Sequence, residues 1–123
     1  MAYHEERYAA VKIEHYSFGK IIIDGKSYTS DVIIYPDRVG ASWWRKEGHN
    51  LNIADLTDVI EAKPDILVVG TGYSGAMKVP QETLKHLESK GITVKVYRSS
   101  EAVELFNALQ TDKKVVVALH LTC

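Results

Sequence analysis

The hydrophobic pattern of the chain changes near residue 50. Before that point, short stretches rich in β-branched and aromatic residues are separated by turn-forming residues, which is typical of strands. Strands are expected over residues 10–16, 20–23, 31–35 and 39–44. Asp24 and Gly25 predict a hairpin, because a type I′ turn needs positive φ at both central positions, and Pro36 marks another turn. The first half is therefore expected to form an antiparallel meander.

After residue 50 the hydrophobic period lengthens from two residues to about 3.6, which predicts helices. The first helix covers residues 53–63, with Asn52 and Asp55 spaced as a cap pair at its start. The second helix begins at Pro80 and stops at Gly91, which suits the usual places of proline and glycine at helix ends.

A third helix follows Ser99 or Ser100, either of which can serve as its N-cap. Two strands, residues 66–69 and 115–119, are apolar at every position, as expected where both faces of a strand are covered, so they should be central. Residues 92–97 alternate instead and are a candidate edge strand. Helices and strands thus follow an α-β-α-β-α-β order, which indicates an α/β domain.

Composition limits the classes of function. The chain has 123 residues and a formal net charge of -1, with no stretch of one sign that would track phosphates, so nucleic acid is not an expected partner. Its apolar runs are far shorter than the roughly 20 residues needed to span a membrane. Glu5 and Glu6 are unlike a signal or transit peptide, and Cys123 is the single cysteine, so we expect a cytoplasmic protein without a disulfide.

We expect a single domain over residues 1–123, strand-rich over 10–45 and alternating between helix and strand over 52–121. Neither an internal repeat nor a linker supports a second domain.

Residues 70–75 read Gly-Thr-Gly-Tyr-Ser-Gly, a G-x-G-x-x-G pattern directly after a buried strand. Three interpretations stay open: a dinucleotide-binding loop, a site for a smaller anion or polar ligand, or a tight strand-to-helix connection. The connection to the next helix is long for a dinucleotide site, and the next strand ends at Arg98 rather than at an acidic residue. Arg98 could instead meet a 2′-phosphate.

A second cluster, Trp43, Trp44, Arg45, Lys46 and His49, lies where the strand-rich half gives way to the first helix. Arginine offers bidentate capture of a carboxylate or phosphate, histidine titrates near neutrality, and tryptophan supplies apolar walls. The alternative is that these are ordinary core and surface residues. The candidate ligand-binding residues are Trp44, Arg45, His49, Gly70, Thr71, Gly72, Ser74, Lys78, Arg98 and Ser99.

Catalytic and metal-binding patterns are weak. His120 and Cys123 are spaced as H-x-x-C, but two ligands do not make a zinc site. Ser74 lacks the spacing of a nucleophile elbow, and no histidine is placed by sequence to activate it. We therefore assign no catalytic residue, no metal and no cofactor, and leave open whether the protein is an enzyme.

Three stretches carry a resemblance to a known family. The matching segments are Trp44-Arg45 with His49, Gly70-x-Gly72-x-Ser74 running into Lys78-Val79-Pro80, and Gly91-Ile92 through Val94 and Val96 to Ala102 and Asn107-Ala108-Leu109. In their order and spacing they resemble the small α/β family of uncharacterised proteins, with the Mth938-like fold, that includes an adipogenesis-associated protein and the mitochondrial complex I assembly factor three.

The resemblance implies a three-layer fold with a mixed central sheet and a smaller N-terminal β layer. It implies action through protein partners and no established reaction. Some positions depart from the family: Trp43 and Trp44 are adjacent where W-x-W is frequent, and Ser99 and Phe106 replace threonine and tyrosine, which could alter a ligand preference.

The functional hypothesis is therefore a non-catalytic interaction, assembly or regulatory module, with an unknown protein partner and a small anion pocket as a further feature. The alternative is a protein or enzyme that binds a small molecule or a nucleotide phosphate through residues 70–75. We expect a monomer or weak homodimer, because an edge strand can pair with a second copy.

Overall fold

The computed structural model describes residues 11–109 and 113–123. A small antiparallel sheet has the strand order β1-β2-β3, with β1 at Ile13–Ser17, β2 at Lys20–Ile23 and β3 at Lys26–Tyr28. A second sheet has the order β5-β4-β8-β6-β7. Its strands are β4 (Val32–Ile34), β5 (Val39–Gly40), β6 (Ile66–Gly70), β7 (Thr93–Tyr97) and β8 (Val115–Leu119).

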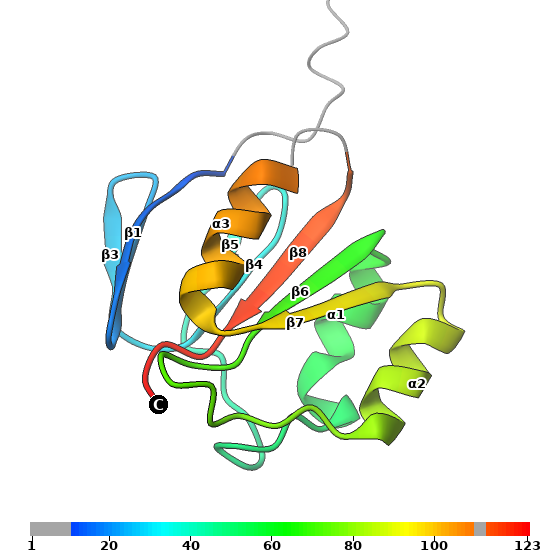
Figure 1. Cartoon of the computed structure of the whole chain (residues 1–123). Helices are drawn as coiled ribbons and strands as arrows, with labels where there is room; N and C mark the ends of the chain where they lie inside the picture. Colours follow the sequence, from blue (N-terminus) through cyan, green and yellow to red (C-terminus); the bar gives the residue numbers. More distant parts are fainter. Residues whose placement is uncertain (1–10, 110–112) are drawn as a thin grey trace, which may run out of the picture.

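The second sheet is mixed. Strand β6 runs parallel to both β7 and β8, whereas β4 runs antiparallel to β8 and to β5. The all-apolar strands β6 and β8 lie inside the sheet and β7 lies at its edge, as the sequence predicts (Figure 1).

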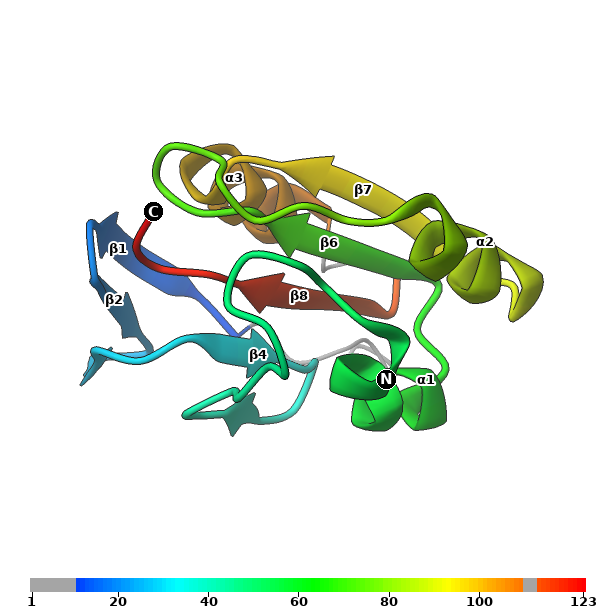
Figure 2. The same cartoon turned by 90° about the horizontal axis from the view of Figure 1, so that it is seen from below.

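Three helices cover this sheet. They are α1 (Thr57–Ala62), which follows a 3-10 turn called η2 (Ile53–Leu56), α2 (Gln81–Ser89) and α3 (Ser99–Leu109). Helix α3 and the small sheet lie on one face of the five-stranded sheet, and α1 and α2 lie on the other (Figure 2). The expected three-layer α/β fold with a mixed central sheet is confirmed.

The core divides along the strands in the same way. In β8, Val115, Val117 and Leu119 pack with Phe106 of α3, whereas Val116 and Ala118 pack in a cluster with helices α1 and α2. Successive side chains of a strand point to opposite faces of the sheet. Because both faces of β8 are covered, every position of the strand is apolar.

Several elements differ from the sequence predictions in their bounds or in the sheet that they join. The strand expected over 39–44 stops at Gly40, because the backbone turns at Ser42, where φ is 59°. The expected meander is split, since β4 leaves the small sheet and joins the larger one. The first helix begins as the 3-10 turn η2. Ser99 and Ser100 both lie in the first turn of α3, so neither is its N-cap, and Ser99 is buried.

The hairpin between β2 and β3 is confirmed. Asp24 and Gly25 have φ values of 48° and 81°, the two positive angles that the type I′ turn needs. Gly25 supplies the second angle without steric cost.

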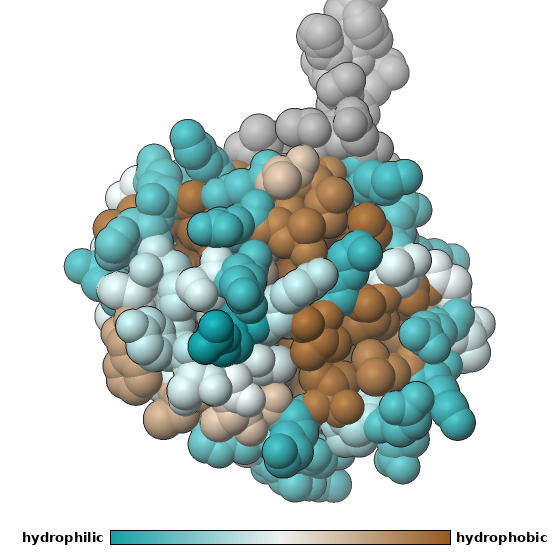
Figure 3. Space-filling model, in the orientation of Figure 1, coloured by the Kyte–Doolittle hydropathy of each residue, from teal (hydrophilic) through white to brown (hydrophobic). Residues whose placement is uncertain are grey.

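Apolar residues gather on the face that carries β7 between α3 and α2 (Figure 3). On β7, Val96 and Tyr97 are exposed by 40% and 44%. Within the described ranges, no helix is long and apolar enough to cross a membrane.

Candidate functional site

A buried polar cluster lies where the carboxyl end of β8 meets the start of β4. Asp31 precedes β4 and His120 follows β8, and the register that pairs Val32 with Leu119 brings the two side chains together. The Asp31 carboxylate accepts hydrogen bonds from Arg45 Nη1 at 2.8 Å and His120 Nδ1 at 2.9 Å through Oδ2. Its Oδ1 accepts one from the Leu121 amide at 2.8 Å.

This cluster is shielded from water, with side-chain exposures of 5% for Arg45, 17% for Asp31 and 7% for His120. Burial by itself raises the pKa of the Asp31 carboxyl. The hydrogen bonds from His120, the Leu121 amide and Arg45 outweigh burial and hold that pKa below its ordinary value. Asp31 is therefore ionised at neutral pH and neutralises Arg45 inside the fold.

The His120 ring is oriented by the same carboxylate. A neutral imidazole carries one N–H, and the Asp31 carboxylate stabilises it on Nδ1. In that tautomer the 3.1 Å approach of Arg45 Nη2 to Nδ1 is not a hydrogen bond. His120 Nε2 is buried and has no hydrogen-bond partner among the described residues. The ring of His49 stands edge-on to that of His120, with centroids 5.4 Å apart.

The Arg45 guanidinium is buried, with 5% of its side chain exposed, and it bonds to groups within the protein. Besides Asp31, its guanidinium donates to the Gly48 carbonyl from Nη2 at 2.8 Å and from Nε at 3.3 Å. It also stacks on the Trp43 ring at 4.8 Å. Arg45 thus fixes the segment around residues 43–48 against the sheet.

The glycine loop, residues 70–75, is packed against the end of the chain. A Cβ on Gly72, whose φ is 114°, would lie 2.4 Å from the Cys123 carbonyl carbon. The Tyr73 amide donates to the Thr122 carbonyl, and the Ser74 hydroxyl donates to the Cys123 carbonyl at 3.1 Å. Close approach of the C-terminal residues therefore explains the glycine at position 72.

Most amides of this loop already donate within the protein. Those of Thr71 and Gly72 donate to the Tyr97 carbonyl and the Ser99 hydroxyl, and that hydroxyl in turn donates to the His120 carbonyl. The chain then runs away from the strand end, and α2 begins only at Gln81 (Figures 1 and 2). In a dinucleotide site the helix that follows the loop has its N-terminus beside the pyrophosphate. Here that helix is α2, and its N-terminus is not beside these glycines.

The remaining sequence candidates lie around this loop. The Lys78 amide donates to the His49 carbonyl at 2.9 Å, which joins the two candidate segments through their backbones, while both side chains are exposed. The side chain of Arg98 lies beside Gly75 and is also exposed.

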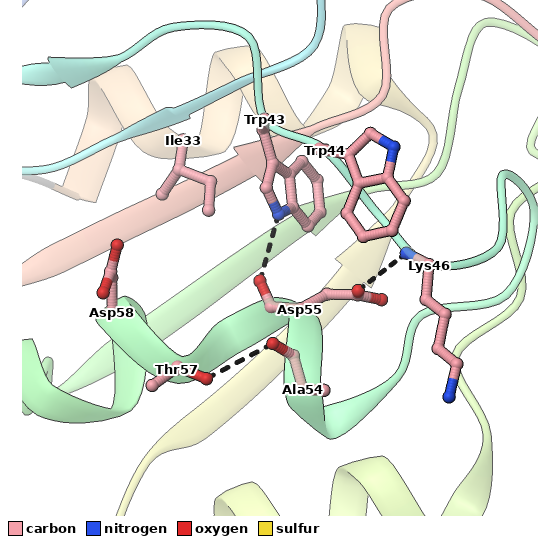
Figure 4. A pocket seen from close by; sticks show the side chains of 8 residues that line it. All are labelled: Ile33, Trp43, Trp44, Lys46, Ala54, Asp55, Thr57 and Asp58. Carbon is pink, nitrogen blue, oxygen red and sulfur yellow. Dashed lines mark hydrogen bonds between the residues drawn. The ribbon is translucent and has the colours of Figure 1, made fainter.

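Trp44 lies in a different place, on a surface groove of about 410 Å³ that we call the tryptophan groove (Figure 4). Its lining residues are Ile33, Trp43, Trp44, Lys46, Ala54, Asp55, Thr57 and Asp58. The structure thus separates Trp44 from Arg45, which belongs to the buried cluster, and from the glycine loop.

The walls of the tryptophan groove are held by hydrogen bonds. The Trp43 indole donates to the Asp55 carbonyl at 3.1 Å. The Asp55 carboxylate accepts the Lys46 and Asn52 amides, each at 2.9 Å, and the second contact confirms the predicted cap pair. The groove is therefore preformed by the turn that starts η2.

Sequence reasoning singled out Arg45 and His49 but missed Asp31 and the role of His120. The available signal was an aspartate directly before an apolar strand and a histidine directly after another. Within residues 11–109 and 113–123, no three potential ligand side chains gather as a metal site requires.

Solved structures share this fold. A conserved hypothetical protein from Pyrococcus horikoshii has 31% identity and a TM-score of 0.75, and the match covers 91% of this chain and 99% of that one. A Mth938-like domain protein from Bordetella pertussis has 19% identity and a TM-score of 0.74, covering 98% and 89%. The fold is thus that of Mth938-like domains.

The chain belongs to the DUF498/DUF598 family of proteins of unknown function, which it matches over residues 13–120. It is also similar to NADH dehydrogenase [ubiquinone] 1 alpha subcomplex assembly factor 3 of Xenopus tropicalis, at 27% identity over 108 residues. That match covers 86% of this chain and 58% of the relative, so the chain spans less than two thirds of that protein.

Proposed function

We propose that this protein is a non-catalytic interaction module for the assembly or regulation of other proteins, and that it docks its partner at the tryptophan groove. The observation that carries the proposal is Trp44, whose residue surface is 77% exposed at the rim of a preformed groove. The relative named as an assembly factor supports the class of function.

Trp44 has the properties of an interface anchor. A large rigid ring loses little conformational entropy on binding, and tryptophan is enriched among the residues that dominate binding energy. Among the described residues, the Trp44 indole N–H has no hydrogen-bond partner. An indole N–H usually has a partner when the ring is buried, so a protein that covers Trp44 is expected to supply one. A partner that covers Trp44 can bury the ring and accept that hydrogen bond.

A site-specific photocross-linker placed at Thr57, on the groove wall, tests the proposal in cells. The same cross-linker at Lys85, an exposed position on α2, is the matched control. We expect one stoichiometric adduct from Thr57 that is lost in the Trp44→Ala variant. Equal adducts from both positions, or an adduct that survives Trp44→Ala, would contradict docking at the groove.

A small anion site has less support than partner docking, because Arg45 is committed to Asp31 and most loop amides donate to protein groups. A thermal shift with inorganic phosphate tests it, since a ligand at a hundredfold excess over its Kd adds about 2.7 kcal/mol of stability.

The compartment and the oligomeric state stay predictions: the cytoplasm, and a monomer or weak homodimer. In the part of the chain that the structure describes, no strand pairs with the outer edge of β7, and this edge and the exposed Val96 favour weak self-association. Light scattering over a concentration series measures the mass directly, and a stable dimer at low concentration would contradict this prediction.

A further inference from the structure

We infer that the tryptophan groove accepts a basic side chain, arginine or lysine, from the partner protein. This inference rests on the proposed function and adds the chemistry by which the groove selects its occupant. It is carried by two indoles and two carboxylates that line one depression (Figure 4).

The carboxylates differ in how they are bonded. Both oxygens of Asp55 accept backbone amides, so that carboxylate is fixed in position. Asp58 is exposed, and its carboxylate accepts no hydrogen bond from the described residues. Asp58 is therefore the carboxylate of the groove that is left to meet a ligand.

The local charge favours a cation. The lining holds two aspartates and one lysine, Lys46, whose side chain extends away from Trp43 and Asp58 in Figure 4. Arg38 lies over the Tyr35 ring and pairs with Asp37, outside the groove lining. An acidic partner would face like charge at Asp55 and Asp58.

The cost of removing water from the Asp58 carboxylate favours a basic partner over a purely apolar one. A partner that fills the groove as far as Asp58 removes water from that carboxylate, and a buried carboxylate without a counter-charge is strongly disfavoured. A guanidinium or ammonium offsets this cost and gains a cation–π contact with an indole. The chain uses the same chemistry internally, where Arg45 stacks on Trp43 while pairing with Asp31.

The probes are two synthetic pentapeptides of equal length and closely similar shape that differ in whether the side-chain end group is charged. One alternates leucine with arginine, and the other carries citrulline, the neutral isostere, at each arginine. Binding is followed by the NMR signal of the Trp44 indole N–H during titration of the full chain. We expect the arginine peptide to shift this signal and to bind about tenfold more tightly than the citrulline peptide.

Two charge-removing variants on helix α1, one inside and one outside the groove lining, provide the test and its control. Asp58→Asn should weaken the arginine peptide about tenfold and abolish its advantage over citrulline. Glu61→Gln removes the same charge from α1 at a position outside the groove lining and should leave both affinities unchanged.

The outcomes separate this inference from the proposed function. If both peptides bind equally, or if Glu61→Gln acts like Asp58→Asn, the basic-side-chain inference fails, while an adduct from the Thr57 cross-linker still supports docking. If neither peptide moves the Trp44 signal, the inference also fails. Loss of the cross-linked adduct as well would overturn docking itself.

Discussion

Removing the Asp31 carboxylate should destabilise the fold more than any comparable change at an exposed ion pair. Asp31→Ala withdraws the acceptor of three hydrogen bonds and leaves Arg45, with 5% of its side chain exposed, without a counter-charge. Breaking a buried ion pair costs about 3–5 kcal/mol. Arg45 keeps its bonds to the Gly48 carbonyl, so we expect the lower end, about 3 kcal/mol.

This loss of free energy corresponds to a decrease in the melting temperature. With an unfolding entropy of roughly 2.1 cal/mol/K per residue, a chain of this length loses about 12 °C for 3 kcal/mol. Urea unfolding gives the free energy and calorimetry gives the midpoint.

The matched control is Asp37→Ala, which breaks the pair between Asp37 and Arg38 at the surface. Those side chains are 76% and 57% exposed, and exposed pairs contribute little. If Asp31→Ala costs under about 1 kcal/mol, or no more than Asp37→Ala, then the buried cluster is not the stabilising element described above.

Three further results are expected. The pKa of Asp31 is depressed in the folded state, so the stability that its carboxylate contributes is present above the unfolded pKa of about 4 and is lost as pH falls through the lower folded pKa. In acid titrations the difference in unfolding free energy between wild type and Asp31→Asn should therefore shrink below about pH 4, and a constant difference would contradict this. Gly72→Ala should cost about 2 kcal/mol in urea unfolding, from left-handed strain plus contact with the Cys123 carbonyl. Gly91→Ala, at φ 81° with open space around it, should cost less, and equal losses would exclude the close approach of the C-terminal residues as the cause. Asp55→Ala should cost about 1 kcal/mol by the same method, because Asp55 at N3 loses its capping-box bond to the Asn52 amide, and it should weaken partner binding by loosening the groove; unchanged stability would contradict the capping box.

Local patterns were sufficient for most of the fold. The two all-apolar strands predicted the sheet interior because a strand with helices or sheet on both faces leaves no position for a polar residue. The Asp24-Gly25 turn and the Asn52 and Asp55 cap pair were equally readable, since each depends on neighbours in sequence. The end of β5 was not, because the positive φ at Ser42 has no clear sequence signal.

The sequence marks Asp31 and His120 only as polar residues that flank apolar strands, and it does not show that they meet, because their contacts join residues that are far apart in sequence. Asp31 meets His120 across 89 positions, and only the pairing of β4 with β8 sets that contact. The glycine loop shows the converse limit, since its pattern resembles a phosphate loop, whereas Gly72 is required by the approach of Cys123.

The most direct test of the account is the affinity of the cross-linked partner, once purified, for wild-type protein and for Trp44→Ala. Tyr73→Ala is the control, because Tyr73 is another exposed aromatic residue, 57% accessible, outside the tryptophan groove. We predict at least a tenfold rise in Kd for Trp44→Ala, about 1.4 kcal/mol, and no change for Tyr73→Ala. Equal affinity of wild type and Trp44→Ala would contradict the tryptophan groove as the docking site.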